Sequence, residues 1–302
     1  MPKTLIVISG PTGIGKTDLS IDIAKMLDTV IISADSRQIY KELQIGTAVP
    51  DKKQLSAVKH FMIQNKSIFD YYSAGKYELE VDKILNENFK IKDNILLVGG
   101  SGLYIDAVCK GIDELPDIDQ DIRKDLCKVY DSDGIESLRF DLKRLDPEYY
   151  EKVDLQNSKR ILKALEICRQ TGKTYTSFLK HSEKKRPFKI IKIGLERDRH
   201  ELYNRINKRV DIMIENGLLE EAEQFLEHKN LNSLNTVGYK ELFPYFENEY
   251  PLERAVELIK RNSRRYAKRQ ITWFKRDKEI NYFHPENIDE INSFIQKMIY
   301  PK

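Results

Sequence analysis

An eight-residue segment near the N-terminus constrains this chain more than any other feature. Residues Gly10–Thr17 read GPTGIGKT and fit the pattern G-x-x-x-x-G-K-[S/T] of a phosphate-binding loop. The apolar run Leu5–Ile8 before the loop predicts a strand, and Asp18–Leu27 behind it carries apolar residues at helical spacing. Between a strand and a helix, the glycines of such a loop turn backbone N–H groups onto phosphate oxygens. The segment therefore predicts a phosphate site and not only a tight turn.

The side chains of this loop supply two further contacts. Lys16 would add a positive charge, and the hydroxyl of Thr17 would bind Mg²⁺, which we expect as the cofactor. ATP is one ligand that such a loop binds, and the diphosphate of a leaving group is another. The candidate nucleotide- or diphosphate-binding residues are Gly10, Pro11, Thr12, Gly13, Ile14, Gly15, Lys16 and Thr17.

The alternation of elements predicts the fold class. The runs Thr29–Ser33 and Asn94–Val98 also read as strands, which is typical of βα units on a parallel sheet. From Leu115 to about Lys180 charged helical segments follow one another with no evident strand, and Phe188–Leu195 returns to the sheet. We predict an α/β protein with a P-loop NTPase-like parallel core, formed by residues 1–115 and 186–302, and a helical insertion domain over 116–185.

Composition excludes several classes of protein. Among 302 residues, 51 Lys and Arg oppose 48 Asp and Glu, a net charge of +3, so any surface that binds nucleic acid must be local. No stretch approaches the roughly 18 consecutive apolar residues of a membrane span. The three cysteines, Cys109, Cys127 and Cys168, lack metal-ligand spacing and are expected to be reduced thiols. We expect a cytoplasmic protein, without membrane contact, that acts as a monomer.

A carboxylate follows the second predicted strand. Asp35 comes directly after Ile31–Ala34, at the end of a parallel strand where ligands bind. General base is the preferred role for Asp35, and a helix cap or turn residue is the alternative. Gln38 can present a donor and an acceptor to an adenine edge, and a solvated loop glutamine is an equal alternative.

A glycine-rich turn follows the strand that would carry the acidic residue of an ATPase. Residues Ile95–Val98 end in Gly99–Gly102 without the magnesium-holding Asp of a Walker B strand. This favours a transferase that uses the phosphate loop on a leaving group. The glycines would let a ligand approach the backbone, and Ser101 would contact that ligand.

A local basic segment lies near the C-terminus. Between Arg254 and Lys278 there are ten Lys and Arg residues, opposed only by Glu257 and Asp277. This bias predicts a helix that binds a polyanion through its phosphates, with Arg265 and Lys268 on the outer face and Tyr266 on the apolar one. Trp273 and Phe274 are expected in the core.

Five motifs in order resemble those of bacterial tRNA dimethylallyltransferases. They are Gly10–Thr17, Asp35–Tyr40 with Ile45–Ala48, Val98–Tyr104, Val237–Glu241 and Ala267–Phe274. The resemblance implies transfer of a dimethylallyl group from dimethylallyl diphosphate to N6 of adenosine 37 in the anticodon loop of tRNA.

The resemblance also implies roles for individual residues. Asp35 would be the base, Lys16 and Thr17 would act on the diphosphate with Mg²⁺, and Ser101 would stand near the flipped adenosine. Arg205 and Arg209 would lie near the diphosphate, although ordinary ion pairs are equally compatible with the arginines. The implied tRNA contacts are Asp35, Ser36, Arg37, Gln38, Ser101, Arg123, Asn157, Lys159, Arg160 and Lys163, together with Arg265 and Lys268.

Two other functions stay open at the level of sequence. A kinase of a small metabolite would use Asp35 as a base toward a hydroxyl, but it leaves the basic C-terminal helix unused. An ATP-gated RNA-binding protein would use that helix, but it needs the missing Walker B carboxylate.

Overall fold

The computed structural model describes residues 3–180 and 183–300. Its contacts divide the chain into two compact units. The core unit comprises Met1–Lys110 and Lys185–Lys302, and the inserted unit comprises Gly111–Lys184. In the sequence, the inserted unit therefore interrupts the core unit once.

The core unit is built on a parallel sheet, which confirms the predicted fold class. Its order is β3-β2-β4-β1-β5-β6, and every neighbouring pair is parallel. The predicted strands appear within a few residues of their expected bounds, whereas β3 and β6 are too short to show a sequence pattern. The strands are β1 (Thr4–Ser9), β2 (Ile31–Ala34), β3 (His60–Phe61), β4 (Asn94–Gly99), β5 (Lys189–Leu195) and β6 (Asn281–Phe283).

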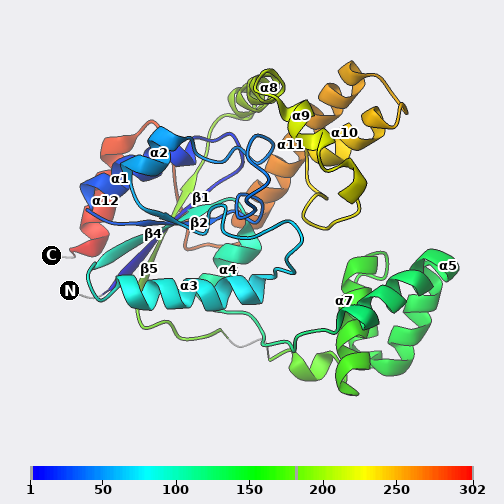
Figure 1. Cartoon of the computed structure of the whole chain (residues 1–302). Coiled ribbons are helices and arrows are strands. Elements are labelled where there is room, and N and C mark those ends of the chain that lie inside the picture. Colours follow the sequence, from blue (N-terminus) through cyan, green and yellow to red (C-terminus); the bar gives the residue numbers. More distant parts are fainter. Residues whose placement is uncertain (1–2, 181–182, 301–302) are drawn as a thin grey trace. The chain divides into compact units, whose positions relative to one another are not determined.

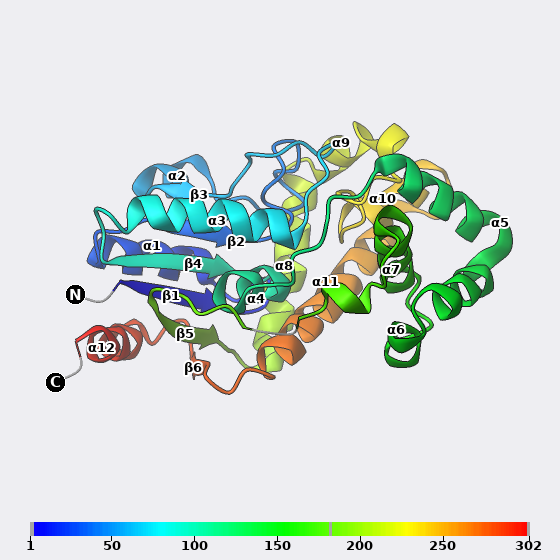
Figure 2. The same cartoon turned by 90° about the horizontal axis from the view of Figure 1, so that it is seen from below.

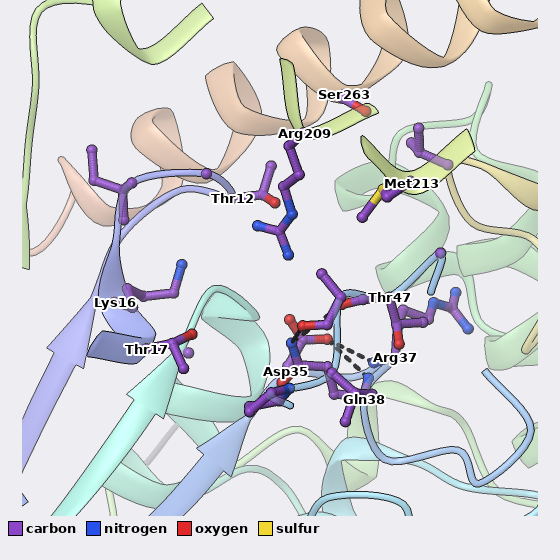
Figure 3. A pocket seen from close by; sticks show the side chains of 18 of the residues that line it. Thr12, Lys16, Thr17, Asp35, Arg37, Gln38, Thr47, Arg209, Met213 and Ser263 are labelled. Carbon is purple, nitrogen blue, oxygen red and sulfur yellow. Dashed lines mark hydrogen bonds between the residues drawn. The ribbon is translucent and has the colours of Figure 1, made fainter. Parts of the chain in front are cut away.

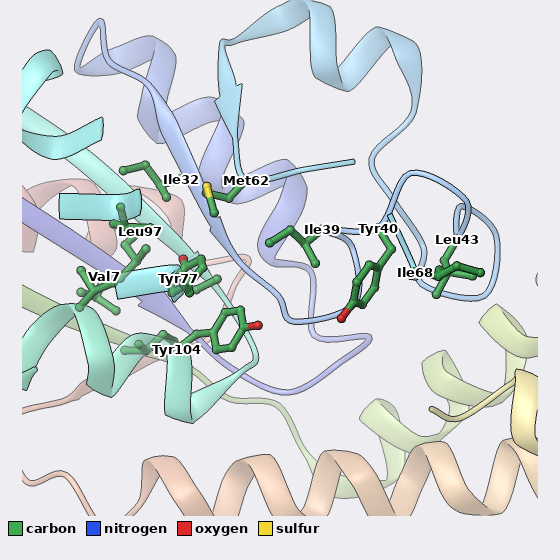
Figure 4. Packing of buried hydrophobic residues seen from close by; sticks show 14 of the residues in the cluster. Val7, Ile32, Ile39, Tyr40, Leu43, Met62, Ile68, Tyr77, Leu97 and Tyr104 are labelled. Atoms are coloured by element: carbon green, nitrogen blue, oxygen red, sulfur yellow. The ribbon is translucent and has the colours of Figure 1, made fainter. Parts of the chain in front are cut away.

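Helices cover both faces of this sheet (Figures 1 and 2). Alternate residues of β1 point to opposite faces, so Ile6 and Ile8 pack with α1 and α12, whereas Leu5 and Val7 pack with α3 and α4 (Figure 4). The helices are α1 (Lys16–Met26), α2 (Lys52–Ala57), α3 (Ala74–Asn88), α4 (Gly102–Lys110), α8 (Arg199–Glu215), α9 (Leu218–Glu223), α10 (Tyr239–Phe246), α11 (Leu252–Phe274) and α12 (Ile288–Ile299).

In its described residues the inserted unit contains helices and no strand. It consists of α5 (Gln120–Leu145), α6 (Pro147–Lys152), α7 (Ser158–Thr171) and a short 3-10 turn. Asp119 caps α5 by accepting the N–H of Asp121. Leu126, Leu138 and Leu165 are fully buried in a core of this unit's own.

The register of the central strands brings three segments to one edge. Ser9 of β1 and Ala34 of β2 both pair with Gly99 of β4, so these strands end level. A Cβ at Gly99 would lie 2.1 Å from the carbonyl oxygen of Ala34, so only glycine allows this approach. The phosphate loop, Asp35 and the turn after β4 therefore leave the sheet side by side.

The structure bears on the expectations about membrane spans and about the cysteines. Within the described residues, no helix is long and apolar enough to cross a membrane. The three cysteines are free, and burial raises the pKa of Cys109 to about 12, so this thiol is uncharged at neutral pH.

Replacing the buried Tyr77 by Phe tests how strongly α3 holds β2. The Tyr77 hydroxyl donates to the carbonyl oxygen of Ser33 at 2.8 Å, two residues before Asp35, and its ring stacks on Tyr104. Tyr77→Phe should lower the free energy of unfolding by about 1–2 kcal/mol, because the buried carbonyl loses its donor. Urea denaturation followed by the fluorescence of the single tryptophan measures this. Tyr300→Phe, at a half-exposed ring, is the control, and an equal effect of both changes would contradict the prediction.

Candidate active site

A cavity of about 800 Å³ opens where the central strands end. Its walls come from segments far apart in the sequence, namely the phosphate loop, Asp35–Gln38, Gly46–Asp51, α8 and α11 (Figure 3). The residues that line it all belong to the core unit.

The phosphate loop has the conformation that its sequence predicts. Gly13 and Gly15 have φ of +80° and +108°, in the left-handed region that favours glycine. The N–H groups of Gly13, Ile14 and Gly15 donate to no other described residue, and α1 begins directly behind them. Free N–H groups at the start of a helix form an anion site, so the loop fits a phosphate or diphosphate.

Positive side chains hold the carbonyl groups of this loop. Lys16 donates through Nζ to the oxygens of Gly10 and Pro11, at 2.9 and 2.8 Å. From the other side, the Nε of Arg205 donates to the oxygen of Gly13 at 3.0 Å. Arg197, which the sequence analysis did not single out, donates to the oxygen of Ile14 at 3.1 Å. These contacts keep the carbonyls away from the anion site.

Lys16, Arg209 and Asp35 are three of the charged residues that line the cavity. Figure 3 shows Arg209 extending from α8 into the space between Lys16 and Asp35. Burial lowers the pKa of Lys16 to about 8, Asp35 opposes this shift, and Arg209 adds to it. Burial likewise lowers the pKa of Arg209, again opposed by Asp35. A bound anion would stabilise the charged forms of both cations.

Asp35 is a turn residue through one carboxylate oxygen and exposes the other to the cavity. Its Oδ1 accepts hydrogen bonds from the N–H groups of Arg37 and Gln38, at 2.9 and 3.2 Å, as a turn residue would. Its Oδ2 has no hydrogen-bond partner among the described residues, and Asp35 lines the cavity. One oxygen therefore orients the carboxylate while the other is available to accept a proton, and its role as base stays a prediction.

Ser101 lies behind the cavity wall. Its hydroxyl accepts from the N–H of Ser36 at 2.9 Å and donates to the Ser36 hydroxyl at 3.1 Å. Ser36 and Tyr266 line the cavity, but Ser101 does not. Ile259, on the predicted apolar face of the same helix, lines the cavity as well, so this face borders the site. A direct role for Ser101 stays a prediction.

The glycines after β4 accommodate the chain itself. A Cβ at Gly100 would lie 2.3 Å from the side chain of Gln270, and one at Gly102 would lie 2.3 Å from the ring of Trp273. At Gly100 and Gly102 the expectation that the glycines admit a ligand is therefore wrong, because α11 fills the space, whereas Gly99 lines the cavity. Trp273 packs in the core as predicted, with its Nε1 donating to Asp106 at 2.9 Å.

Arg37 and Gln38 hold two walls of the cavity. The guanidinium of Arg37 donates to the carbonyls of Asn232, Ser233 and Asn235, at 3.0 to 3.3 Å. The Nε2 of Gln38 donates to the carbonyls of Thr47–Ala48, at 3.2 and 2.9 Å. Both amide hydrogens of Gln38 are thus used, so the idea that it presents a donor and an acceptor is wrong and only its oxygen is available. Contacts of these two residues with tRNA stay predictions.

Glu221 is a residue that the sequence analysis missed. Its carboxylate accepts the N–H groups of Gln44–Gly46, and Tyr239 donates to it at 2.6 Å. A Cβ at Gly46 would lie 2.6 Å from the Tyr239 ring. Two of the motifs, around Gly46 and Tyr239, therefore meet each other through Glu221. A glutamate on an amphipathic helix carries no local signal of this role.

The predicted tRNA contacts of the inserted unit differ in their surroundings. Arg123 forms an ion pair of 2.9 Å with Glu166, which is 1% exposed, and Lys163 lies 3.9 Å from the same carboxylate. The ion-pair alternative therefore holds for Arg123. Asn157 caps α7 by accepting the N–H of the third residue after it. Lys159 and Arg160 are exposed and form no ion pair with a described residue.

The basic helix α11 separates its cations into two groups. Lys260 pairs with Asp211 at 2.5 Å, and Arg264 donates to Asn207 at 2.6 Å, so both fasten α11 to α8. Arg265 and Lys268 are exposed and have no ion-pair partner among the described residues. These two are available for a polyanion, as predicted for the outer face.

The pKa of Lys16 predicts how anion affinity depends on pH. Protonated Lys16 binds diphosphate better, so the affinity should be full below pH 8 and fall by up to about tenfold per pH unit above it. Calorimetry with inorganic diphosphate measures this, and Lys16→Arg, which stays charged, corrects for ionisation of the ligand. The ratio of the wild-type affinity to that of Lys16→Arg should decrease from about pH 7 to about pH 9.5. A constant ratio would show that Lys16 does not titrate there.

Known proteins resemble this chain over nearly its whole length. tRNA dimethylallyltransferase 1 of Bacteroides fragilis is 56% identical over 98% of this chain and 99% of that protein. The enzyme of the same name from Phocaeicola vulgatus is 54% identical over 99% of both chains. Both organisms are bacteria, as the sequence resemblance predicts.

Solved structures agree with the fold. The full-length tRNA isopentenylpyrophosphate transferase of Bacillus halodurans is 34% identical, covers 97% of this chain and 95% of its own, and superposes with a TM-score of 0.71. A eukaryotic dimethylallyltransferase acting on tRNA is 25% identical over 90% of this chain and 70% of its own, with a TM-score of 0.71. Residues 38–277 match the family described as IPP transferase. With the phosphate loop and Asp35 meeting in one cavity, these matches show that the chain belongs to the IPP transferase family.

Proposed function

We propose that this protein transfers a dimethylallyl group from dimethylallyl diphosphate to N6 of adenosine 37 in the anticodon loop of tRNA. One observation carries the proposal. The unsatisfied N–H groups of the phosphate loop, with Lys16 and Arg209, share a cavity with the free oxygen of Asp35. A leaving diphosphate and a proton acceptor can therefore occupy the two sides of one reaction centre.

The proposed reaction makes one bond and breaks one. The N6 lone pair of adenosine forms a bond to C1 of the dimethylallyl group while the C1–O bond breaks. The diphosphate leaves with the electron pair of that bond, and its charge is stabilised by the phosphate loop, Lys16 and Arg209. The proton lost from N6 passes to the carboxylate of Asp35.

The residues present also fit the Mg²⁺ that a diphosphate substrate would bring. Mg²⁺ takes few protein ligands beside phosphate oxygens and water. The Thr17 hydroxyl lines the cavity and makes no hydrogen bond to a described residue, so it is available as one ligand. When bound, the ion would neutralise charge that develops on the leaving group.

Exposed cations would hold the tRNA, and its target base would lie in a single-stranded loop. Arg265 and Lys268 on α11, with Lys159 and Arg160 in the inserted unit, would contact phosphates, which position an RNA without reading its sequence. A target base leaves its stack most cheaply from a single-stranded loop, which suits an anticodon loop. Because one chain lines the entire cavity, we propose that the monomer is active.

The two alternative functions lose their support. The family match places the chain among transferases, whereas a kinase of a small metabolite leaves the exposed cations of α11 without a role. An ATP-gated RNA-binding protein would not require a free carboxylate oxygen opposite the phosphate loop.

A mass spectrum of nucleosides tests the proposal directly. Unmodified tRNA with adenosine at position 37 is incubated with the protein, Mg²⁺ and dimethylallyl diphosphate. We expect adenosine to gain one C₅H₈ unit, and the same tRNA with guanosine at position 37 to remain unmodified. No gain on a tRNA that another enzyme of this activity modifies would overturn the proposal.

Asp35→Asn should separate chemistry from binding. The amide oxygen can still accept the two backbone N–H groups, but the side chain can no longer take a proton. The single-turnover transfer rate should fall by about 10²- to 10⁴-fold, while tRNA affinity stays nearly unchanged. Asp51→Asn is the control, because Asp51 lines the same cavity and caps α2, a role that Asn also performs. A large loss of tRNA affinity with residual transfer would contradict the assigned role.

Replacing both Arg265 and Lys268 by Ala should weaken tRNA binding in a salt-dependent manner. The slope of log affinity against log salt should become less steep by about 0.7–0.9 for each lost phosphate contact. Filter binding over a range of salt concentrations measures this slope. The control replaces Lys25 and Lys297, exposed cations of α1 and α12, and removes the same charge. An unchanged slope in the α11 variant would mean that this face is only solvated.

A further inference from the structure

One buried glutamine joins α11 to the phosphate loop. Gln270 is 6% exposed and lies near buried Ala267 and Trp273 on the inner face of the helix. Its Oε1 accepts the N–H of Thr12 at 2.9 Å, and its Nε2 donates to the carbonyl oxygen of Gly100 at 2.9 Å. A single carboxamide therefore links the phosphate loop, the turn after β4 and the long basic helix.

The turn after β4 is shaped to receive this side chain. A Cβ at Gly100 would lie 2.3 Å from Nε2 of Gln270, so the turn and the helix are in direct contact. The next turn of the helix is seated in the same way, because Trp273 occupies the space over Gly102. The helix cannot move along this turn without breaking the contact.

The same turn leads to the carboxylate. Ser101, directly after Gly100, accepts the N–H of Ser36, the neighbour of Asp35. The connection thus runs from Gln270 through the turn to Ser36, the residue directly after Asp35. Gln270 stands between the two halves of the reaction centre, the phosphate loop and the Asp35 turn.

On the loop side, Thr12 differs from the residues after it. The N–H groups of Gly13, Ile14 and Gly15 have no acceptor in the described chain and are available to an anion. The N–H of Thr12 is taken by Gln270 instead. Gln270 therefore anchors the start of the loop without occupying its anion site.

We propose that Gln270, which lines the cavity with both ends of its carboxamide bonded to the protein, is a positioning residue that sets the distance between the diphosphate in the phosphate loop and the carboxylate of Asp35. The inference rests on the proposed transfer reaction, because that reaction places a diphosphate at the phosphate loop and N6 of adenosine at the carboxylate of Asp35. In-line displacement at C1 requires the nucleophile and the leaving group to be held in one geometry. A buried contact between rigid elements provides such a constraint better than a solvated one.

The chemistry of the site explains why a carboxamide is needed. The N–H of Thr12 requires an acceptor, and the carbonyl of Gly100 requires a donor, so the side chain must supply both at its end. An ionised glutamate keeps the acceptor but places a negative charge against a carbonyl oxygen. Methionine keeps the length of the side chain and supplies neither contact.

The test compares Gln270→Met and Gln270→Glu with Gln224→Met, at an exposed glutamine of the same unit. The protein is assayed for single-turnover transfer, for affinity toward inorganic diphosphate and for tRNA affinity. Gln270→Met should lower the transfer rate at saturating substrates by about 10- to 100-fold, since small misplacements of reacting groups cost this much. Its diphosphate affinity should fall by a smaller factor, and its tRNA affinity should change by less than about twofold. Gln224→Met should behave as wild type.

The pH profile of Gln270→Glu separates positioning from a general loss of structure. Burial raises the pKa of a glutamate, and the protonated form can both accept from Thr12 and donate to Gly100. The transfer rate of Gln270→Glu relative to wild type should therefore recover as the pH falls from about 8 to about 6. Gln270→Met should show no such recovery. A destabilised fold would lower both variants at every pH.

Two results would overturn the inference. One is a Gln270→Met protein that keeps its melting temperature and transfers within about twofold of the wild-type rate. The other, used if Gln270→Met does not fold, is a Gln270→Glu protein whose relative rate is independent of pH. If the wild type itself transfers no dimethylallyl group, the proposed function fails. In that case the inference is tested separately, and it is overturned if a folded Gln270→Glu protein binds inorganic diphosphate as tightly as the wild type.

Discussion

The parallel pairing of β4 with both β1 and β2 is the constraint on which the site depends. Gly99 lies opposite Ser9 on one side and Ala34 on the other, so three strands end level at one edge of the sheet. Each strand is buried on both faces, which fixes its register, because a shift by one residue would exchange the two cores. The phosphate loop and Asp35 consequently leave the sheet as neighbours, although they are far apart in the chain.

The charges in the cavity prepare it for an anion. Lys16 and Arg209 are both desolvated, and the carboxylate of Asp35 offsets only part of their charge. Desolvated cations are costly in the free protein, and a diphosphate would relieve that cost on binding. The same arrangement leaves the second oxygen of Asp35 without a hydrogen-bond partner among the described residues.

Several polar residues hold the walls of the cavity through hydrogen bonds within the protein. Arg37 and Gln38 bond the carbonyls of two loops, and Glu221 collects the N–H groups of a third segment. Their side chains use most of their hydrogen-bonding capacity within the protein. The walls are thereby set before substrate arrives, which reduces the reorganisation that the reaction requires. Gln270 belongs to the same class of residue.

The sequence by itself determined the class of the fold, the phosphate loop and the position of Asp35 after a strand. These are local properties, since glycine at a positive φ, apolar periodicity and the order of strand, loop and helix are written in adjacent residues. The tertiary structure decided which side chains complete the site. Gln270 finds its partners 258 and 170 residues away, and Tyr266 and Glu221 carry no local mark of their roles. Such contacts depend on how the helices pack on the sheet, and single-sequence patterns do not encode that packing.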